Sequence, residues 1–435
     1  MKKLALFVGR PVIKKPLPQY NFIGKEEERA ALKAVKERIL SGFVGRAGSY
    51  FLGGKYVKEL ETRICKHFKV KYAVSFNSAT TALQAAVGAL GIGPGDEVIT
   101  SPYTMTATAS AILFNNALPV FADIEENSFC LDPESIEKNI NDKTKAILAV
   151  NMLGGSANYN PILKIAKKYK LKIIEDNAQS AGATYNGKFT GTIGDIGVFS
   201  FNVHKIIQCG EGGVLVTNNK KYAFRAQLIR NHGEAVINDL CKSGHSKKNY
   251  EPILGNNFRL TEIQAAIAIE QFKKMDKLNK PRTMLADYLS KQLSQFKWLI
   301  PPSVFKNSIH VYYGYGFRFL SEKINIKRQT FVNAMKAEGF PLVIGCEDPV
   351  YLMPVYQKQQ MYPNCKFPFI SKEYPHNISY KKGICPVAER MSEKELLIAT
   401  ICHPPQTKKD IDLFIEAVKK IEENIAELKR YEKKI

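Results

Sequence analysis

Ile173-Ile-Glu-Asp-Asn-Ala-Gln179 is the stretch that decides the fold, because a short apolar run ends there in acidic and amide side chains. It is followed by Phe199-Ser-Phe-Asn-Val-His-Lys205 and by the glycine-rich Gly210-Glu-Gly-Gly213. Ligands of open α/β sheets bind at the rim formed by the carboxyl ends of the parallel strands. We therefore predict that Asp176 lies at such a rim and that Lys205 is presented on a short turn between two strands.

Strand and helix patterns alternate along the chain around this stretch. Such alternation predicts βαβ units, and hence a mostly parallel sheet covered by helices in a three-layer α/β/α arrangement. The strands are expected at 72–75, 97–100, 119–121, 146–150, 171–175, 196–201 and 213–217, and the helices at 26–40, 56–68, 80–90, 107–114, 133–140 and 161–169.

The chain changes character toward its C-terminal end, where a proline-, tyrosine- and lysine-rich irregular stretch spans 347–386. We predict an N-terminal arm at 1–25, a large α/β domain at 26–285 and a smaller α+β domain at 286–435. A ligand is expected in the cleft between the two domains. The other elements expected in this half are a helix at 261–275, a second helix through about 293, a strand at 311–317 and helices at 329–338 and 411–428.

The composition describes an ordinary globular protein with a strong positive charge. Apolar residues make up 45% of the chain, and the formal net charge is +22. Because the lysines are spread along amphipathic helices and not gathered on one stripe, we predict no nucleic-acid partner, although a positive field could draw an anionic substrate to a cleft. The eight cysteines occur singly, without metal or disulfide spacing, and no apolar run is long enough for a membrane span. A cytoplasmic protein without a metal site is expected.

Asp176 and Lys205 together form the pair that pyridoxal 5′-phosphate (PLP) requires. This cofactor forms a Schiff base with a lysine amine and pairs its pyridine nitrogen with a carboxylate, which favours the protonated ring. Either residue alone would more often be a cap or a surface side chain. The segment Asn77-Ser-Ala-Thr-Thr-Ala-Leu83 opens a helix whose first N–H groups attract a phosphate, with Ser78, Thr80 and Thr81 as further donors. Taken alone, that segment is a helix N-cap.

The order of these blocks resembles the DegT/StrS family of sugar aminotransferases, which have the fold-type-I PLP architecture. The resemblance runs over nearly the whole chain and rests on the succession of blocks, since no single block is decisive. The blocks are Gly53-Gly54, Ser78-Ala-Thr-Thr-Ala-Leu83, Pro102-Tyr-Thr104, Pro119-Val-Phe-Ala-Asp123, Glu175-Asp-Asn-Ala-Gln179, Gly194-Asp-Ile-Gly197, Phe199-Ser-Phe201, Gly210-Glu-Gly-Gly213, Gly255-Asn-Asn-Phe-Arg259 and Thr261-Glu-Ile-Gln-Ala-Ala266.

The resemblance implies a role for each matching residue. Lys205 would bond to PLP and move a proton between substrate and cofactor, and Asp176 would pair with the pyridine nitrogen. The other contacts would come from Gln179 at the ring hydroxyl, from Ala79, Thr80 and Ser200 at the phosphate, and from Asn257, which would reach the phosphate from the partner subunit of a homodimer with composite active sites.

Two positions depart from the family pattern, and a third, His204, raises the alternative of a dehydratase. Ala79 stands where glycine is usual, and Met105 stands where an aromatic residue commonly stacks on the ring, so either Met105 or Tyr103 covers the cofactor. Some relatives carry histidine in place of the lysine and are sugar dehydratases. Alignment of the flanking blocks places Lys205, and not His204, at that position.

The expected function is amino transfer from L-glutamate or L-glutamine to a keto sugar, with nucleotide-linked sugars as the first choice. A keto-cyclitol of the inosose type is the alternative, because Leu4-Ala-Leu-Phe-Val-Gly-Arg-Pro-Val12 and Cys385-Pro-Val-Ala-Glu389 are similar to blocks of that branch. A PLP-dependent dehydratase and a non-catalytic regulatory protein with the PLP fold are the remaining alternatives. The intact pair of Asp176 and Lys205 argues against the regulatory protein.

Overall fold

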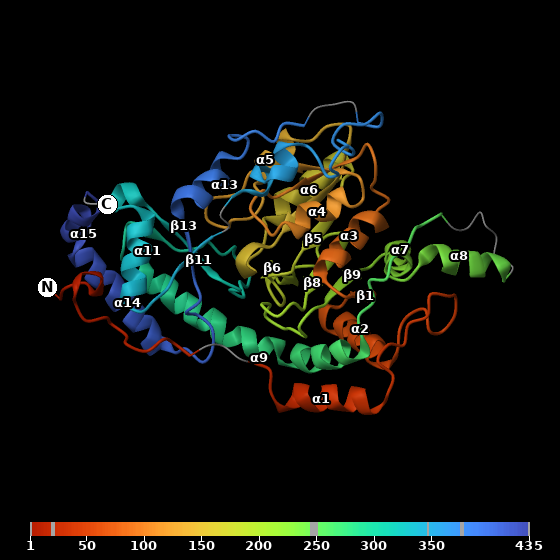
Figure 1. Ribbon diagram of the computed structural model, residues 1–435, viewed down its shortest axis with the longest axis horizontal. Helices are drawn as coiled ribbons and strands as arrows, with labels where there is room; N and C mark the ends of the chain where they lie inside the picture. The colour runs from red at the N-terminus through yellow and green to blue at the C-terminus, as the bar shows by residue number, and fades with distance from the viewer. Residues whose placement is uncertain (1, 19–21, 244–250, 346–347, 375–377, 434–435) are drawn as a thin grey trace.

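A seven-stranded, mostly parallel sheet forms the centre of the larger lobe (Figure 1). The computed structural model describes residues 2–18, 22–243, 251–345, 348–374 and 378–433. The strand order is β1-β9-β8-β5-β4-β2-β3, and β9 runs antiparallel to both of its neighbours. This confirms the predicted fold class. The strands are β1 (Tyr72–Phe76), β2 (Glu97–Thr100), β3 (Leu118–Phe121), β4 (Thr144–Val150), β5 (Lys172–Asp176), β8 (Ile196–Ser200) and β9 (Gly213–Thr217), and β6 (Thr184–Tyr185) and β7 (Lys188–Phe189) form a separate hairpin.

Helices cover both faces of this sheet, because successive strand residues point to opposite sides. Leu148 and Ile174 pack under α3 and α7, whereas Ile147 and Ile173 pack with α6 on the other face. Phe199 lies on that second face with α2 and α9. The helices are α1 (Lys25–Lys36), α2 (Lys55–Phe68), α3 (Ala79–Ala89), α4 (Ala107–Leu113), α5 (Pro133–Lys138), α6 (Tyr159–Tyr169), α7 (Lys220–Arg230), α8 (Gly233–Lys242) and α9 (Glu262–Leu293).

The smaller lobe has an antiparallel sheet of order β10-β11-β13-β12, packed against helices. Its core contains the fully buried Leu4 of the N-terminal arm, and the backbone nitrogen of Ala5 donates to Glu338 at 2.8 Å. None of the described helices is both long and apolar enough to cross a membrane. The elements are β10 (Leu299–Ile300), β11 (Tyr315–Phe319), α10 (Ser321–Ile324), α11 (Arg328–Ala337), β12 (Val343–Ile344), α12 (Pro354–Gln357), α13 (Pro386–Arg390), β13 (Leu396–Ala399), α14 (Lys408–Glu423) and α15 (Ile425–Glu432).

Helix α9 is one continuous helix of 32 residues, where the sequence pattern predicted two. It begins at a capping box formed by Thr261 and Gln264, and it continues through Pro281. Its first half packs in the core of the larger lobe as far as Met275, and its second half packs in the smaller lobe from Leu285 onward. The boundary predicted at residue 285 therefore lies inside a helix that both cores hold in place. In contrast, the helix expected at 411–428 is divided into α14 and α15, which meet at Asn424.

The irregular stretch at 347–386 also differs from expectation, because its described residues pack on the larger lobe. Tyr351, Tyr356, Phe369 and Tyr380 are buried in the same core as the residues of β2, β3 and β4. The Tyr380 hydroxyl donates to the carbonyl of Pro119 at 3.0 Å. These aromatic side chains cover the sheet next to β3, so a segment assigned to the second domain contributes to the core of the first.

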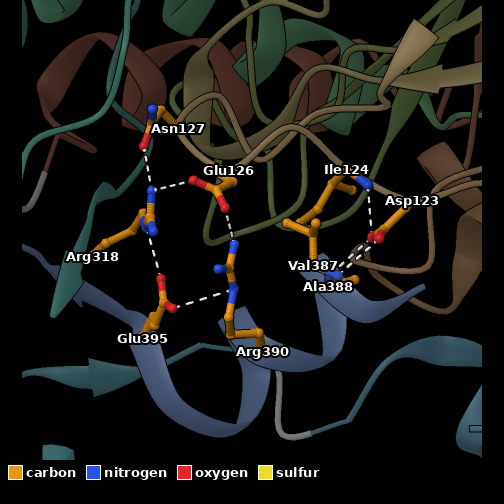
Figure 2. Close-up of polar contacts among 9 residues, drawn as sticks. All are labelled: Asp123, Ile124, Glu126, Asn127, Arg318, Val387, Ala388, Arg390 and Glu395. Carbon is orange, nitrogen blue, oxygen red and sulfur yellow. Dashed lines mark hydrogen bonds and ion pairs between the residues drawn. The ribbon is translucent and has the colours of Figure 1, made fainter. Parts of the chain in front are cut away.

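Two sets of polar contacts connect the next segment, 387–395, to the loop after β3 (Figure 2). The Asp123 carboxylate accepts the N–H groups of Val387 and Ala388 at 2.8 and 2.9 Å, at the start of α13. Beside it, Arg318 of β11 donates to Glu395 at 2.8 Å and also to Glu126 at 2.8 Å. Arg390 contacts the same two carboxylates, which closes a ring of four charged side chains.

Arg318 should contribute more to stability than Arg390, because Arg318 is buried and Arg390 is partly exposed. The Arg318→Met variant leaves the buried Glu395 without its main partner, and we expect it to lower the free energy of unfolding by about 3 kcal/mol. Arg390→Met is the matched control and should cost about 1 kcal/mol or less. Urea denaturation monitored by fluorescence measures both variants, and equal losses would contradict the assignment.

Candidate active site

The candidate site lies at one edge of the large sheet, where β1, β5 and β8 all end. β5 and β8 are parallel neighbours, and β1 has the same direction because β9 runs antiparallel between β8 and β1. The register pairs Gly213 with Phe76 at the end of β1 and with Ser200 at the end of β8. The start of α3, which follows β1, therefore lies near the ends of both strands that carry the predicted residues.

The start of α3 has the geometry of an anion site. Ser78 is its N-cap, and its hydroxyl accepts the Thr81 N–H at 3.2 Å. The Thr81 hydroxyl is used inside the protein, since it donates to Asn77 at 2.7 Å. The first N–H groups of a helix have no acceptor within it, so those of Ala79 and Thr80 are suited to an anion. Of the three hydroxyls proposed as phosphate donors, those of Ser78 and Thr81 lie within hydrogen-bond distance of each other, at 3.1 Å.

Asp176 ends β5 with its carboxylate buried, at 5% exposure. One oxygen accepts the Thr108 hydroxyl at 2.8 Å, and the other accepts the N–H of Ala178 at 3.1 Å. Burial raises the pKa of Asp176, and the hydrogen bond from Thr108, the N–H of Ala178 and the charge of Lys205 oppose that rise. The carboxylate is thus held by neutral donors, and the charge of Lys205 also acts on it.

Lys205 lies in a hydrogen-bonded turn within the loop 201–212 that joins β8 to β9. Backbone hydrogen bonds close this turn, with Val203 N to Gly210 O at 2.8 Å and Lys205 N to Asn202 O at 2.9 Å. Burial lowers the pKa of Lys205, against the opposing effect of the Asp176 charge. A lowered pKa increases the fraction of neutral amine, which is the nucleophilic form.

Tyr313 is a site residue that the sequence analysis missed. The Lys205 ammonium lies 4.7 Å from the centre of its ring, at cation–π distance. The sequence pattern predicts a strand at 311–317, but β11 begins only at Tyr315, so Tyr313 lies in the preceding loop. The run of tyrosines after His310 was the available signal, and alternation alone could not show which of them reaches the lysine.

Gln179 and Ser200 lie near the same strand ends, each with one hydrogen bond already made. The side-chain oxygen of Gln179 accepts the Leu153 N–H at 2.8 Å, which leaves its amide nitrogen as the donor. The hydroxyl oxygen of Ser200 accepts the Asn202 N–H at 3.3 Å, so its own hydrogen is available to an acceptor.

The two candidates for covering a bound ring differ sharply in exposure. Tyr103 has no exposed surface and packs in the core of the larger lobe, whereas Met105 is 63% exposed. His204 is also exposed, and its backbone nitrogen donates to Asn202 at 3.1 Å.

Asn257 lies in a segment that runs beside the end of β1, because the carbonyl of its neighbour Phe258 accepts the Asn77 N–H at 2.9 Å. The Asn257 side chain is exposed and accepts a hydrogen bond from Arg259 at 2.7 Å. Within the described ranges, His, Cys, Asp and Glu side chains form no group of three or more that could hold a metal ion.

Comparison with known proteins places this architecture in a family. Residues 42–395 match the model of the DegT/DnrJ/EryC1/StrS aminotransferase family. GDP-perosamine synthase of Caulobacter vibrioides is 34% identical over 70% of this chain and 79% of its own. A putative L-glutamine:3-amino-2,3-dideoxy-scyllo-inosose aminotransferase of Micromonospora echinospora is 30% identical over 99% of both chains.

Solved structures agree with this placement. The aminotransferase from Psychrobacter cryohalolentis superposes with a TM-score of 0.79 at 28% identity, covering 94% of this chain and all of the other. The family model spans both lobes, and it includes the strand ends and the turn that carry Asp176 and Lys205. The chain therefore belongs to the DegT/DnrJ/EryC1/StrS aminotransferase family.

Proposed function

We propose that the chain transfers an amino group from L-glutamate or L-glutamine to a keto sugar, using PLP held covalently by Lys205. The observation that carries this proposal is the juxtaposition of the buried Asp176 and the half-buried Lys205 at the sheet edge where α3 begins. The family accounts for the cofactor, and the donor set suits it: a carboxylate for the pyridine nitrogen, an amine of lowered pKa and a helix N-terminus for the phosphate.

Each residue has a defined task in this proposal. PLP supplies, when bound, a protonated ring that accepts electrons from the substrate carbon bearing the nitrogen. The ionised Asp176 would hold the proton on the ring nitrogen, and the Lys205 amine would move a proton between the substrate carbon and the cofactor, away from the amino donor in the first half of the reaction and toward the keto acceptor in the second. Tyr313 lies under that amine and stabilises its protonated form.

The remaining contacts hold and cover the cofactor. Ala79 and Thr80 offer N–H groups to the phosphate, with the Ser200 hydroxyl as a third donor, and the Gln179 amide is the donor for the ring hydroxyl. The exposure of Met105 and the burial of Tyr103 favour Met105 as the residue that covers the ring. The exposure of His204 and the proximity of Lys205 to Asp176 favour amino transfer over the dehydratase alternative.

Nucleotide-linked keto sugars are the proposed acceptors, and two observations bear on this choice. The net charge of +22 suits a substrate that carries a diphosphate. The full-length match to the putative inosose aminotransferase, which includes the N-terminal arm, favours a keto-cyclitol as the second candidate. We place the protein in a reducing, cytoplasmic compartment, consistent with free cysteines throughout the described chain.

The covalent bond is the first test. Borohydride reduction of the PLP-loaded protein should fix the cofactor on Lys205, as located by peptide mass spectrometry, and Lys205→Ala should abolish turnover because both the bond and the proton carrier are lost. Lys188→Ala, which changes an exposed lysine of the β6–β7 hairpin, is the control and should behave as wild type. Recovery of the adduct on another lysine would refute the assignment.

The acceptor class is tested by pairing each amino donor with nucleotide-linked keto sugars and with scyllo-inosose. We expect amination of a nucleotide-linked sugar, with kcat/KM falling several-fold between about 20 and 200 mM salt because the substrate is anionic. Amination of scyllo-inosose with little salt dependence would establish the cyclitol alternative. Loss of water from the substrate would indicate a dehydratase, and bound PLP that reacts with no amino donor would indicate a regulatory protein.

The composite site of a homodimer is tested by complementation. Asn257→Asp should be inactive because its carboxylate repels the phosphate, and Lys205→Ala should be inactive for lack of the amine. When the two variants exchange subunits, one site of each mixed dimer receives both wild-type residues. Activity should therefore rise to at most about a quarter of wild type. A fully active monomer, measured by analytical ultracentrifugation, would exclude the shared site.

A further inference from the structure

The hydroxyls of Thr104 and Thr108 form a chain of hydrogen bonds that ends at the Asp176 carboxylate. Thr108 lies in the first turn of α4, has no exposed surface and donates its hydroxyl to Asp176 at 2.8 Å. The hydroxyl of Thr104, also buried, lies 2.8 Å from that of Thr108. The three side chains thus form a continuous chain of hydrogen bonds within the protein interior.

The direction of this chain follows from counting hydrogens. A threonine hydroxyl carries one hydrogen, and that of Thr108 is used on the Asp176 carboxylate. Thr104 must therefore donate to Thr108, since the bond between them has no other hydrogen available. Both hydroxyls point the positive ends of their dipoles toward Asp176, and hydrogen bonds aligned in this way strengthen one another.

Asp176 needs such a donor because its surroundings change during the proposed reaction. Lys205 is the cation whose charge reaches Asp176 in the described structure. Under the proposed function it would be bonded to the cofactor in the resting enzyme and free during turnover. The bond from Thr108 involves neither the cofactor nor the substrate. It can therefore hold the carboxylate ionised and in one orientation, whatever the state of the lysine.

We propose that Thr108, supported by Thr104, is the positioning residue that keeps Asp176 ionised and aimed at the ring nitrogen of PLP. This inference rests on the proposed role of Asp176 as the partner of that nitrogen. A β-branched side chain suits the task, because the methyl group of threonine restricts its rotation and so fixes the direction of the hydroxyl. Serine keeps the donor with less restriction, and valine keeps the shape without the donor.

The test compares Thr108→Val with Thr108→Ser in the full-length protein, using two readouts that do not depend on turnover. One is the dissociation constant of PLP, and the other is the ¹⁵N chemical shift of ring-labelled PLP, which reports protonation of the ring nitrogen. Thr108→Val should weaken PLP binding about ten-fold, as expected for losing a hydrogen bond to a charged group, and should move the shift toward the unprotonated value. Thr108→Ser should stay within about three-fold of wild type, and Thr104→Val should show a smaller change in the same direction.

Thr100→Val is the matched control. Thr100 is also fully buried, and its hydroxyl donates to the carbonyl of Leu148 at 3.0 Å and not to Asp176. The same chemical change at Thr100 should leave the ¹⁵N shift and PLP affinity at wild-type values, so an equal effect at both positions would overturn the proposal. Thr104→Val and Thr108→Ser keep the test decisive if Thr108→Val does not fold.

The Asp176→Asn variant separates failure of this inference from failure of the proposed function. If Asp176→Asn changes the shift and the affinity while Thr108→Val leaves both unchanged, the threonine chain has no role and the function proposed for Asp176 stands. If Asp176→Asn also leaves the ¹⁵N shift unchanged, Asp176 is not the partner of the ring nitrogen and both proposals fall.

Discussion

A side chain at Gly213 would occupy the space in which α3 begins, because its Cβ would stand 2.6 Å from the backbone nitrogen of Ala79. This close approach lets β9 lie between β1 and β8 while the helix start remains next to the strand ends. The start of α3, the Asp176 carboxylate and Lys205 come from three separate segments, and they lie together because β1, β5 and β8 run in the same direction and β9 runs antiparallel between β1 and β8. The geometry of the candidate site thus depends on Gly213, a residue without a side chain that could take part in the reaction.

Contacts between the lobes hold the smaller lobe in position next to the candidate site. Tyr313 lies two residues before β11, and Arg318 of the same strand is tied to Glu126 after β3. The aromatic ring next to Lys205 is therefore carried by a segment that is anchored on the larger lobe. Together with α9, which is buried in both cores, these contacts fix the smaller lobe relative to the site.

The sequence was most informative where the chemistry is local. The fold class, the strand ends and the turn bearing Lys205 follow from patterns within a few residues, and the structure confirms the parallel sheet. The features that the sequence could not reveal depend on contacts between residues far apart in the chain. Thr108 reaches Asp176 across 68 positions, and the burial of Tyr380 against β3 joins segments still farther apart. The two helices predicted at 261–275 and through about 293 are the single helix α9, because periodicity does not report which core a helix face enters.

The ends of the chain meet in the smaller lobe, and this has a consequence for biosynthesis. Leu4 and Leu428 belong to one core, Phe7 and Tyr431 are in ring contact at 5.3 Å, and Figure 1 shows both termini on the same side of the molecule. The strands of the central sheet lie within residues 72–217, and α9 and the aromatic residues at 351–380 complete the core of the larger lobe later in the chain, whereas the smaller lobe also needs α14 and α15. During synthesis, the core of the smaller lobe is therefore completed only when α14 and α15 have left the ribosome, later than the strands of the central sheet.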